Sequence, residues 1–313
     1  MALFAAACVA VDAAGQGEHQ PSDFSVSASY VAISEAGFDG AHSGRSASVR
    51  ETQLAVVFPM VNGRNSVLTA GIDYQYSRFE YDGIAGRDRD LHRLLLPLRW
   101  HYRGRGWITN AEVAAGLSTS SNVFNTFWKD ATSDDTILTA SIETTFPRRT
   151  EGPRWLLGVS YDRTFGESRL YPSFGTIFSP SAPMSIRLAF PDSAVRYATS
   201  ERQHWTLRLF PSGHKWHVVS DELGTNFDYR AEAMRVEGTW RKKTRASIWV
   251  EVTLGYEFER RHRWTDDTGQ VIDANLGSNS LVQIRFRKGE AVDQVSRLLN
   301  SHSTRQRAGN NAE

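Results

Sequence analysis

A two-residue alternation of apolar and polar side chains returns along most of this chain, and it limits the possible folds more than any other feature. Over residues 68–76 the apolar members are Leu68, Ala70, Ile72, Tyr74 and Tyr76. A β-strand sends successive side chains to opposite faces, so each such stretch has one apolar and one polar face. Many such stretches, joined by polar turns, predict an all-β fold: a single antiparallel transmembrane β-barrel with lipid outside and water or charge inside.

The clearest alternation runs over residues 246–259. Val250 and Leu254 lie on its apolar face and Glu251 on its polar face, while Trp249 breaks the pattern. Strands of soluble proteins usually have about five or six residues, whereas a tilted membrane strand needs about 9–11. The length of this segment therefore favours a barrel over the alternative, a soluble β-sandwich.

The composition agrees with a barrel. Mean hydropathy is −0.42, a value compatible with a membrane barrel because half of each barrel strand is polar. Many of the 9 Trp and 10 Tyr residues fall near predicted strand ends, where amphipathic rings favour the membrane–water boundary. A net charge of +1 excludes a global field that would recruit nucleic acid. Cys8 is the one cysteine, which excludes a disulfide within the chain and a cysteine-based metal site.

Short polar turns and long connections largely alternate along the chain, as in bacterial barrels with short periplasmic turns and longer outer loops. We expect an even strand number, either 12 or 14. The count of fourteen takes Met184–Tyr197 as one strand with a bulge at Phe190–Ser193. It also takes His204–Phe210 and Lys215–Val219 as two strands with a turn at Pro211–Gly213. Residues 260–279 are expected to form a long loop.

The two ends of the chain differ in composition from its middle. Residues 1–15 are apolar and then small, and they resemble the remnant of a secretory signal peptide; a tail or a buried N-terminal strand is the alternative. Residues 16–23 read as a polar leader and residues 24–288 as the barrel. Residues 289–313 are a polar tail that we expect to be disordered.

If the apolar side chains face lipid, the residues that alternate with them face the lumen. We predict a charged lumen lining made of Asp73, Arg99, Glu112, Glu143, Asp162, Arg187, Arg208, Arg235, Glu237, Glu251, Glu257, Arg285 and Arg287. One interpretation is a set of Arg–carboxylate pairs that fills the interior, because paired charges avoid the cost of isolated buried ions. The other is an electrostatic constriction that selects charged solutes.

Enzymatic and cofactor chemistry has weaker support. On spacing alone, the candidates for a hydrolase at the barrel rim are His42 with Ser43, Asp90 with His92, and His214 with His217. Spacing does not bring such groups within hydrogen-bond reach. The histidines at 204, 214 and 217 lack the spacing of a dedicated metal site, and no glycine-rich phosphate loop opens a helix. We predict no catalytic residue, no cofactor and no bound metal.

A stretch in the second half of the chain carries motifs of a known family. Between Leu170 and Arg263 these are Tyr171-Pro172, Leu188-Ala189-Phe190-Pro191, Arg196-Tyr197, Trp205-Thr206-Leu207, Trp216-His217-Val218-Val219 and the stretch from Met234 to Arg261. The stretch resembles a family of Gram-negative outer-membrane β-barrel proteins classed as a domain of unknown function. The resemblance implies a barrel in the bacterial outer membrane and brings no catalytic or binding residues.

Such a barrel has outer-membrane lipid and the barrel assembly machinery as partners. Residues 282–286 resemble the terminal aromatic signal of outer-membrane barrels, although residues 287–313 follow it. The function expected first is a narrow porin-like channel for small polar solutes or ions. The alternatives are a non-conducting structural or binding barrel with a charge-plugged lumen and, more remotely, a hydrolase at the rim. The sequence leaves the oligomeric state open.

Overall fold

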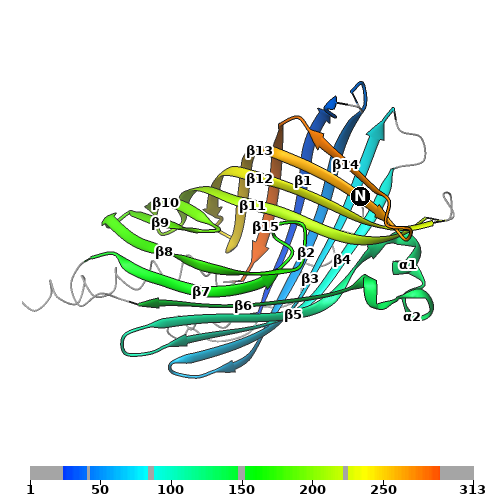
Figure 1. Ribbon diagram of the computed structural model, residues 1–313. Helices are drawn as coiled ribbons and strands as arrows, with labels where there is room; N and C mark the ends of the chain where they lie inside the picture. The colour runs from blue at the N-terminus through cyan, green and yellow to red at the C-terminus, as the bar shows by residue number, and fades with distance from the viewer. Residues whose placement is uncertain (1–23, 41–42, 84–87, 147–151, 221–224, 290–313) are drawn as a thin grey trace, which may run out of the picture.

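The computed structural model describes residues 24–40, 43–83, 88–146, 152–220 and 225–289. These residues form one antiparallel sheet that curls round and closes on itself (Figure 1). The expectations for residues 1–23 and 290–313, and the candidate His42, lie outside the described residues. Among the described residues, no helix has the length and hydropathy to cross a bilayer.

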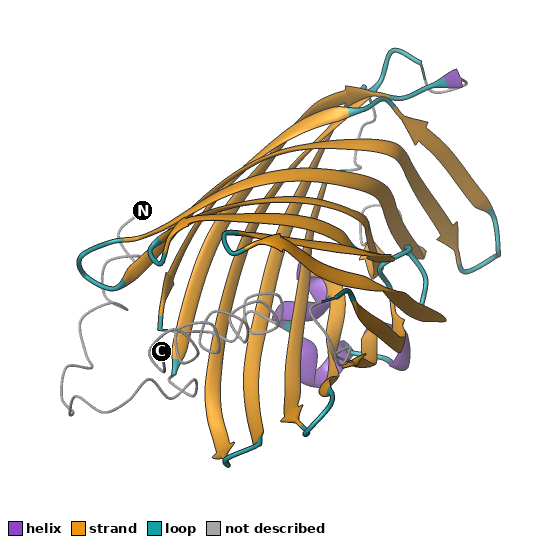
Figure 2. Ribbon diagram, turned by 90° about the vertical axis from the view of Figure 1, so that its left-hand side faces the viewer, coloured by secondary structure: helices purple, strands orange, loops and turns teal. Residues whose placement is uncertain are grey.

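Strands make up almost all of the fold. They are β1 (Ser25–Gly37), β2 (Ser46–Asn62), β3 (Ser66–Asp82), β4 (Arg89–Arg103), β5 (Ile108–Ser120), β6 (Thr136–Phe146), β7 (Arg154–Asp162), β8 (Arg169–Ser181), β9 (Met184–Phe190), β10 (Ser193–Ser200), β11 (Gln203–Ser220), β12 (Thr225–Lys243), β13 (Ile248–Asp266), β14 (Val271–Leu276) and β15 (Asn279–Lys288). Three short helical segments lie between β5 and β6 (Figure 2): α1 (Ser121–Asn125), α2 (Phe127–Asp130) and η3 (Ser133–Asp135).

Fourteen of these strands form the ring. Each strand from β1 to β13 pairs with the next along the chain, and β15 closes the ring between β13 and β1. The six-residue β14 pairs with the outer end of β13, and two residues connect it to β15. The predicted all-β antiparallel barrel with an even strand number, 12 or 14, is therefore confirmed, and the number is fourteen.

Two details of the predicted strand list are wrong, and their effects on the count cancel. Residues 184–197 contain two strands, because the chain reverses at Pro191-Asp192 and Ala194 pairs with Arg187. The predicted turn at Pro211–Gly213 lies inside β11, where these three residues pair with residues 232–234 of β12. The pairing of β10 with β11 ends at Leu209. Pro211 has no N–H to donate, but it also has no β10 residue opposite it that would require one. The expected loop at 260–279 contains the outer part of β13 and all of β14.

The outer surface of the barrel carries a band of large apolar side chains. Leu188, Leu207 and Leu254, from three different strands, are 54%, 54% and 63% exposed. Water does not favour a continuous apolar surface of this kind, whereas a bilayer does. The protein is a membrane barrel of the bacterial outer-membrane type, and its short turns mark the periplasmic end.

The wall of the barrel is uneven in height. β9 and β10 have 7 and 8 residues, whereas β12 and β13 each have 19. In Figure 1, β7 to β10 end well short of the right-hand end reached by β11 and β12. Strands of 7 or 8 residues are shorter than the roughly 9–11 that span a bilayer.

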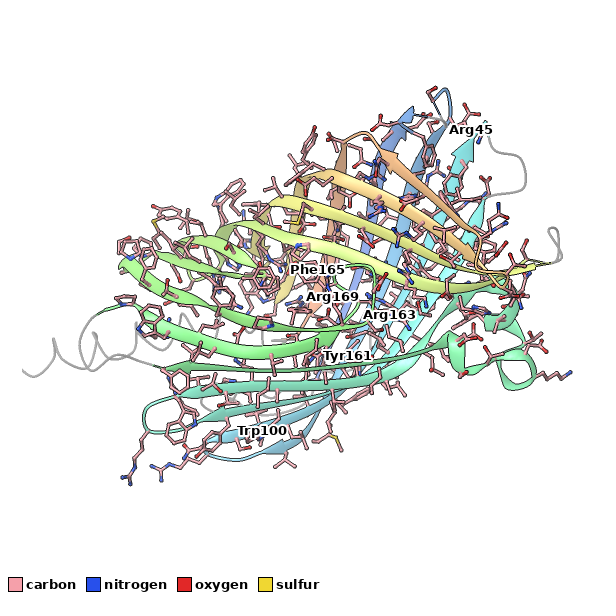
Figure 3. The ribbon with its side chains drawn as sticks, in the orientation of Figure 1. Arg45, Trp100, Tyr161, Arg163, Phe165 and Arg169 are labelled. Carbon is pink, nitrogen blue, oxygen red and sulfur yellow. The ribbon has the colours of Figure 1, made fainter. Side chains whose placement is uncertain are left out.

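The outer part of β11 instead joins β5 directly. His217 pairs with Thr119, and the Ser118 hydroxyl donates to the Lys215 carbonyl at 2.5 Å. Arg163, labelled in Figure 3 between β7 and β8, donates to the same carbonyl at 3.0 Å. All fourteen strands therefore form the ring at the periplasmic end. Toward the outer end β6 to β10 have ended, and β5 and β11 lie next to each other. The lumen narrows in that direction.

Candidate functional site

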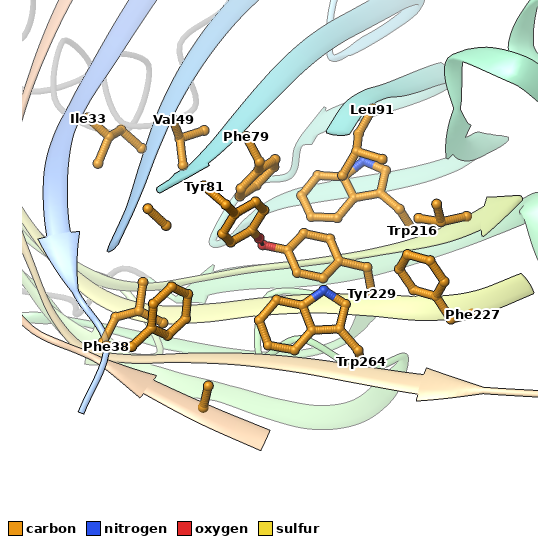
Figure 4. Close-up of a cluster of buried hydrophobic side chains, with 14 of the residues drawn as sticks. Ile33, Phe38, Val49, Phe79, Tyr81, Leu91, Trp216, Phe227, Tyr229 and Trp264 are labelled. Carbon is orange, nitrogen blue, oxygen red and sulfur yellow. Dashed lines mark hydrogen bonds between the residues drawn. The ribbon is translucent and has the colours of Figure 1, made fainter. Parts of the chain in front are cut away.

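The lumen of the outer half is filled by apolar and aromatic side chains that point inward. Trp216 and Tyr229 are each 1% exposed, and Phe79 packs edge-on against both, with ring centroids 5.6 and 5.1 Å away (Figure 4). Tyr81 and Trp264 flank this group. We call these five residues the aromatic plug. They belong to β3, β11, β12 and β13, so the plug joins strands on both sides of the ring.

Hydrogen bonds join the two tyrosine hydroxyls of the plug, whereas Trp216 Nε1 is buried without a hydrogen-bond partner among the described residues. The Tyr81 hydroxyl donates to the Tyr229 hydroxyl at 2.7 Å, and that oxygen lies 3.0 Å from His262 Nδ1. Aliphatic neighbours, among them Leu91 and Val218, are also fully buried. Among the described residues, close packing of these side chains fills much of the lumen of the outer half. The expectation that inward side chains are polar along the whole strand is therefore wrong for the outer half.

The inner half of the lumen is charged. Arg99 donates to Asp73 at 2.7 Å and to Glu112 at 2.6 Å. Arg235 contacts Glu257 at 2.5 Å and Glu237 at 3.4 Å. These six residues come from five strands, β3, β4 and β5 on one side of the ring and β12 and β13 on the other.

A second group of charges surrounds Glu251. Its carboxylate lies 3.2 Å from Arg241, 3.5 Å from Arg285 and 4.0 Å from Arg287. Three guanidinium groups therefore share the Glu251 carboxylate, and Glu237 adds a second negative charge near Arg285. The 3.2 Å contact joins Arg241 Nε to Glu251 Oε1 and is an ion pair without hydrogen-bond geometry.

The remaining predicted lumen residues lie on or beside the low wall of the barrel, by which we mean the part formed by β6 to β10. Arg187 makes a bidentate pair with Glu143, at 3.0 and 2.7 Å. Arg208 donates to Asp192 at 2.8 Å. The Asp162 carboxylate accepts a hydrogen bond from the Tyr171 hydroxyl at 2.6 Å. The structure thus brings the thirteen predicted side chains into several separate groups rather than one ring of charge.

Several further charged side chains face the lumen and were not predicted from the sequence. They are Glu51, Arg93, Asp192, Arg241 and Arg260. Arg93 has apolar inward neighbours two residues away, Leu91 and Leu95, so the polar face was not recognisable there. Arg241 lies in the polar run Arg241–Thr244, which has the composition of a turn, but β12 continues to Lys243. Glu51 keeps the alternation and could have been found from it.

A cavity of about 370 Å³ opens in the inner half. Its lining comes from six consecutive strands of the ring, β15, β1, β2, β3, β4 and β5. Ser25, Val67 and Asn110 place it close to the periplasmic strand ends, and Gln75 and Arg93 lie at its deeper end, toward the plug.

The histidines offered as catalytic or metal candidates have other partners. His92 Nε2 lies 2.8 Å from the Ser121 hydroxyl, but its Nδ1 meets the Tyr74 hydroxyl, at 2.8 Å, rather than a carboxylate. A catalytic imidazolium is normally oriented and stabilised by an anionic group at that nitrogen. His214 Nδ1 accepts from Arg93 at 3.2 Å, and His217 lies 3.6 Å from Asp228. The described residues contain no group of three or more His, Cys, Asp or Glu placed to hold a metal ion.

Comparison with known proteins finds similarity of shape at low identity. An outer membrane channel from Pseudomonas putida F1 is 14% identical, with 89% of this chain and 99% of that chain covered and a TM-score of 0.48. The P. putida toluene transporter TodX is 9% identical, with 85% and 90% covered and a TM-score of 0.39. LpxR from Salmonella typhimurium is 10% identical, with 84% and 99% covered and a TM-score of 0.36. Likenesses this weak transfer no activity to this chain.

Comparison of the sequence with known families and proteins does not assign this chain to a family. No protein-family model matches the chain, and no curated protein matches it. The resemblance of residues 170–263 to a family of outer-membrane barrels therefore stays a prediction.

Proposed function

We propose that this outer-membrane barrel does not conduct along its axis at rest and acts as a binding barrel that holds a small solute on its periplasmic side. The single observation that supports this most is the aromatic plug. Trp216 and Tyr229 are buried in the middle of the outer lumen, where an open channel would need water. The cavity below the plug supplies a place for a ligand.

Single-channel recording of the refolded protein in a planar bilayer tests this proposal. The native protein is expected to insert without conducting steps. The double variant Trp216→Ala and Phe79→Ala removes two adjoining rings of the plug and is expected to conduct. Leu254→Ala changes an exposed side chain of the outer face and serves as the control, which should insert and stay silent. Steady steps from the native protein would overturn the proposal.

A narrow channel for small polar solutes or ions is the second candidate. The observation in its favour is the charged inner half, which offers paired ions and a cavity on the way to the plug. In this candidate the plug is a gate that moves. This second candidate would be supported if the native protein conducts and a variant whose aromatic plug is held in place does not.

A further inference from the structure

We propose that the cavity of the inner half is a binding site for a small organic oxyanion, such as a short dicarboxylate. This names the ligand class for the proposed binding function and rests on that function.

The hollow exists because the inward side chains of β1 and β2 are small. Ser25, Ser27 and Ser29 follow one another along the inner face of β1, and Ala55 lies beside them on β2. Larger residues at these positions would fill the space, as Val31 and Ile33 do farther along β1. The volume of about 370 Å³ lies within the range of roughly 300–1,000 Å³ that small-molecule sites occupy.

Arginines border this hollow on two sides. Arg285 and Arg287 come from β15, and Arg93 and Arg99 from β4. Asp73 is the acidic residue in the lining. The lining therefore carries an excess of positive charge around small, uncharged hydroxyl groups.

The four arginines differ in how well they are neutralised. Arg99 has two short ion pairs, with Asp73 and Glu112, so we assign it a structural role. Arg93 contacts His214, and the carboxylates of Glu51 and Asp73 act on it from beyond ion-pair distance. Its guanidinium can therefore accept a ligand anion.

Arg285 and Arg287 make no short ion pair with a carboxylate of the described residues, although Glu237 also contributes negative charge near Arg285. Their nearest contacts to Glu251 are 3.5 and 4.0 Å, and that carboxylate is closer to Arg241. Within the described part of the chain, Arg287 Nε is buried without a hydrogen-bond partner. An oxyanion between these groups would supply short charge-assisted hydrogen bonds that the protein itself does not provide.

Neutral polar groups complete the site. Ser29 donates to Gln53 Oε1 at 3.2 Å, and Arg285 approaches the same oxygen at 3.4 Å. Ser27 and Thr69 also line the cavity. Hydroxyl and amide groups can hydrogen-bond a carboxylate or the polar body of the ligand, so the site favours a hydrophilic anion over an apolar one.

Isothermal titration calorimetry of the refolded full-length protein in detergent tests the proposal. The probes are succinate, inorganic phosphate and succinamide, the last a neutral molecule of nearly the same shape as succinate. Succinate or phosphate should bind, and succinamide should not. Arg287→Gln and Arg93→Gln should each weaken binding by roughly tenfold or more, because each removes a charged hydrogen-bond donor.

Two further variants separate a lost site from a misfolded barrel. Ser27→Leu fills the hollow without changing charge, and it should abolish binding while heat-modifiable migration on gels stays normal. Arg50→Gln removes an exterior arginine and should bind like the native protein. Equal heats for succinate and succinamide, or native affinity in both Ser27→Leu and Arg287→Gln, would refute the site. Calorimetry is independent of conductance, so failure here is distinguishable from failure of the non-conducting barrel.

Discussion

Arg187 of β9 reaches across two intervening strands to form a bidentate ion pair with Glu143 of β6. Gly158 on β7 and Gly175 on β8 make this possible. Gly158 pairs directly with Glu143, and Gly175 pairs with Ala189, two residues from Arg187. A Cβ at Gly158 would collide with the backbone of β6, and one at Gly175 with β9. The pair therefore ties the low wall of the barrel together through its lumen.

Loss of this pair should destabilise the barrel. Glu143→Gln removes the charged partner of an Arg187 side chain that is only 12% exposed, and we expect the free energy of unfolding to fall by about 3 kcal/mol. Urea titration of the refolded protein in micelles measures the loss. Glu80→Gln affects a solvent-exposed pair with Arg50 and should cost less than about 1 kcal/mol. Equal losses for the two variants would contradict a special role for the lumen pair.

The apolar band predicts where a charge is most costly. Leu254 is 63% exposed on the outer face, and Leu254→Arg should lower stability in a bilayer by about 2–4 kcal/mol. Asp267→Arg, in the exposed turn between β13 and β14, should have almost no effect. Denaturant titration in lipid vesicles compares them. Tolerance of Arg at position 254 would mean that this face does not meet lipid.

The aromatic plug should contribute to stability through volume more than through its hydrogen bonds. Trp216→Ala leaves a large cavity and should cost about 3–5 kcal/mol. Tyr81→Phe removes one hydroxyl, while Tyr229 keeps His262 as a partner, and should cost about 1 kcal/mol. Thermal or urea unfolding of both variants provides the comparison. A larger loss for Tyr81→Phe would point to the hydrogen-bond chain as the main stabilising feature.

The hairpin formed by the outer end of β13 and by β14 should respond to acid. Hydrogen bonds from Arg261, with help from Arg263, lower the pKa of Asp273 to about 2. Because the folded-state pKa lies below the usual value of about 3.9, the stabilisation is complete above pH 4 or so and disappears as the pH falls toward 2. Amide exchange in β14 should therefore speed up over this range.

Asp273→Asn provides the check on this pH effect. The variant removes the titrating group, so amide exchange in β14 should be faster than in the native protein at pH 6 and should show no further conformational acceleration between pH 4 and 2. Intrinsic exchange rates of model peptides correct for the chemical effect of pH. A native-like pH response in the variant would assign the acid sensitivity to another group.

The sequence by itself determined which face of most strands meets lipid. The alternation in residues 246–259 placed Leu254 outside and Glu251 inside, because side chains of a strand alternate between two faces whatever the strand pairs with. Ring closure followed from the need to satisfy every backbone hydrogen bond in a bilayer, and the even strand number from the antiparallel pairing of bacterial barrels. Local pattern is sufficient for these features.

Tertiary structure alone decided what fills the lumen. Inward Phe79, Trp216 and Tyr229 cannot be told from lipid-facing residues by hydropathy, because their partners lie on other strands, up to 150 residues away in sequence. Likewise, Pro211–Gly213 has the composition of a turn, yet it lies within β11 because pairing with β12 continues on one side and β10 has already ended on the other. The arginines of β4 and β15 border one cavity only because the ring brings these strands together around the small side chains of β1.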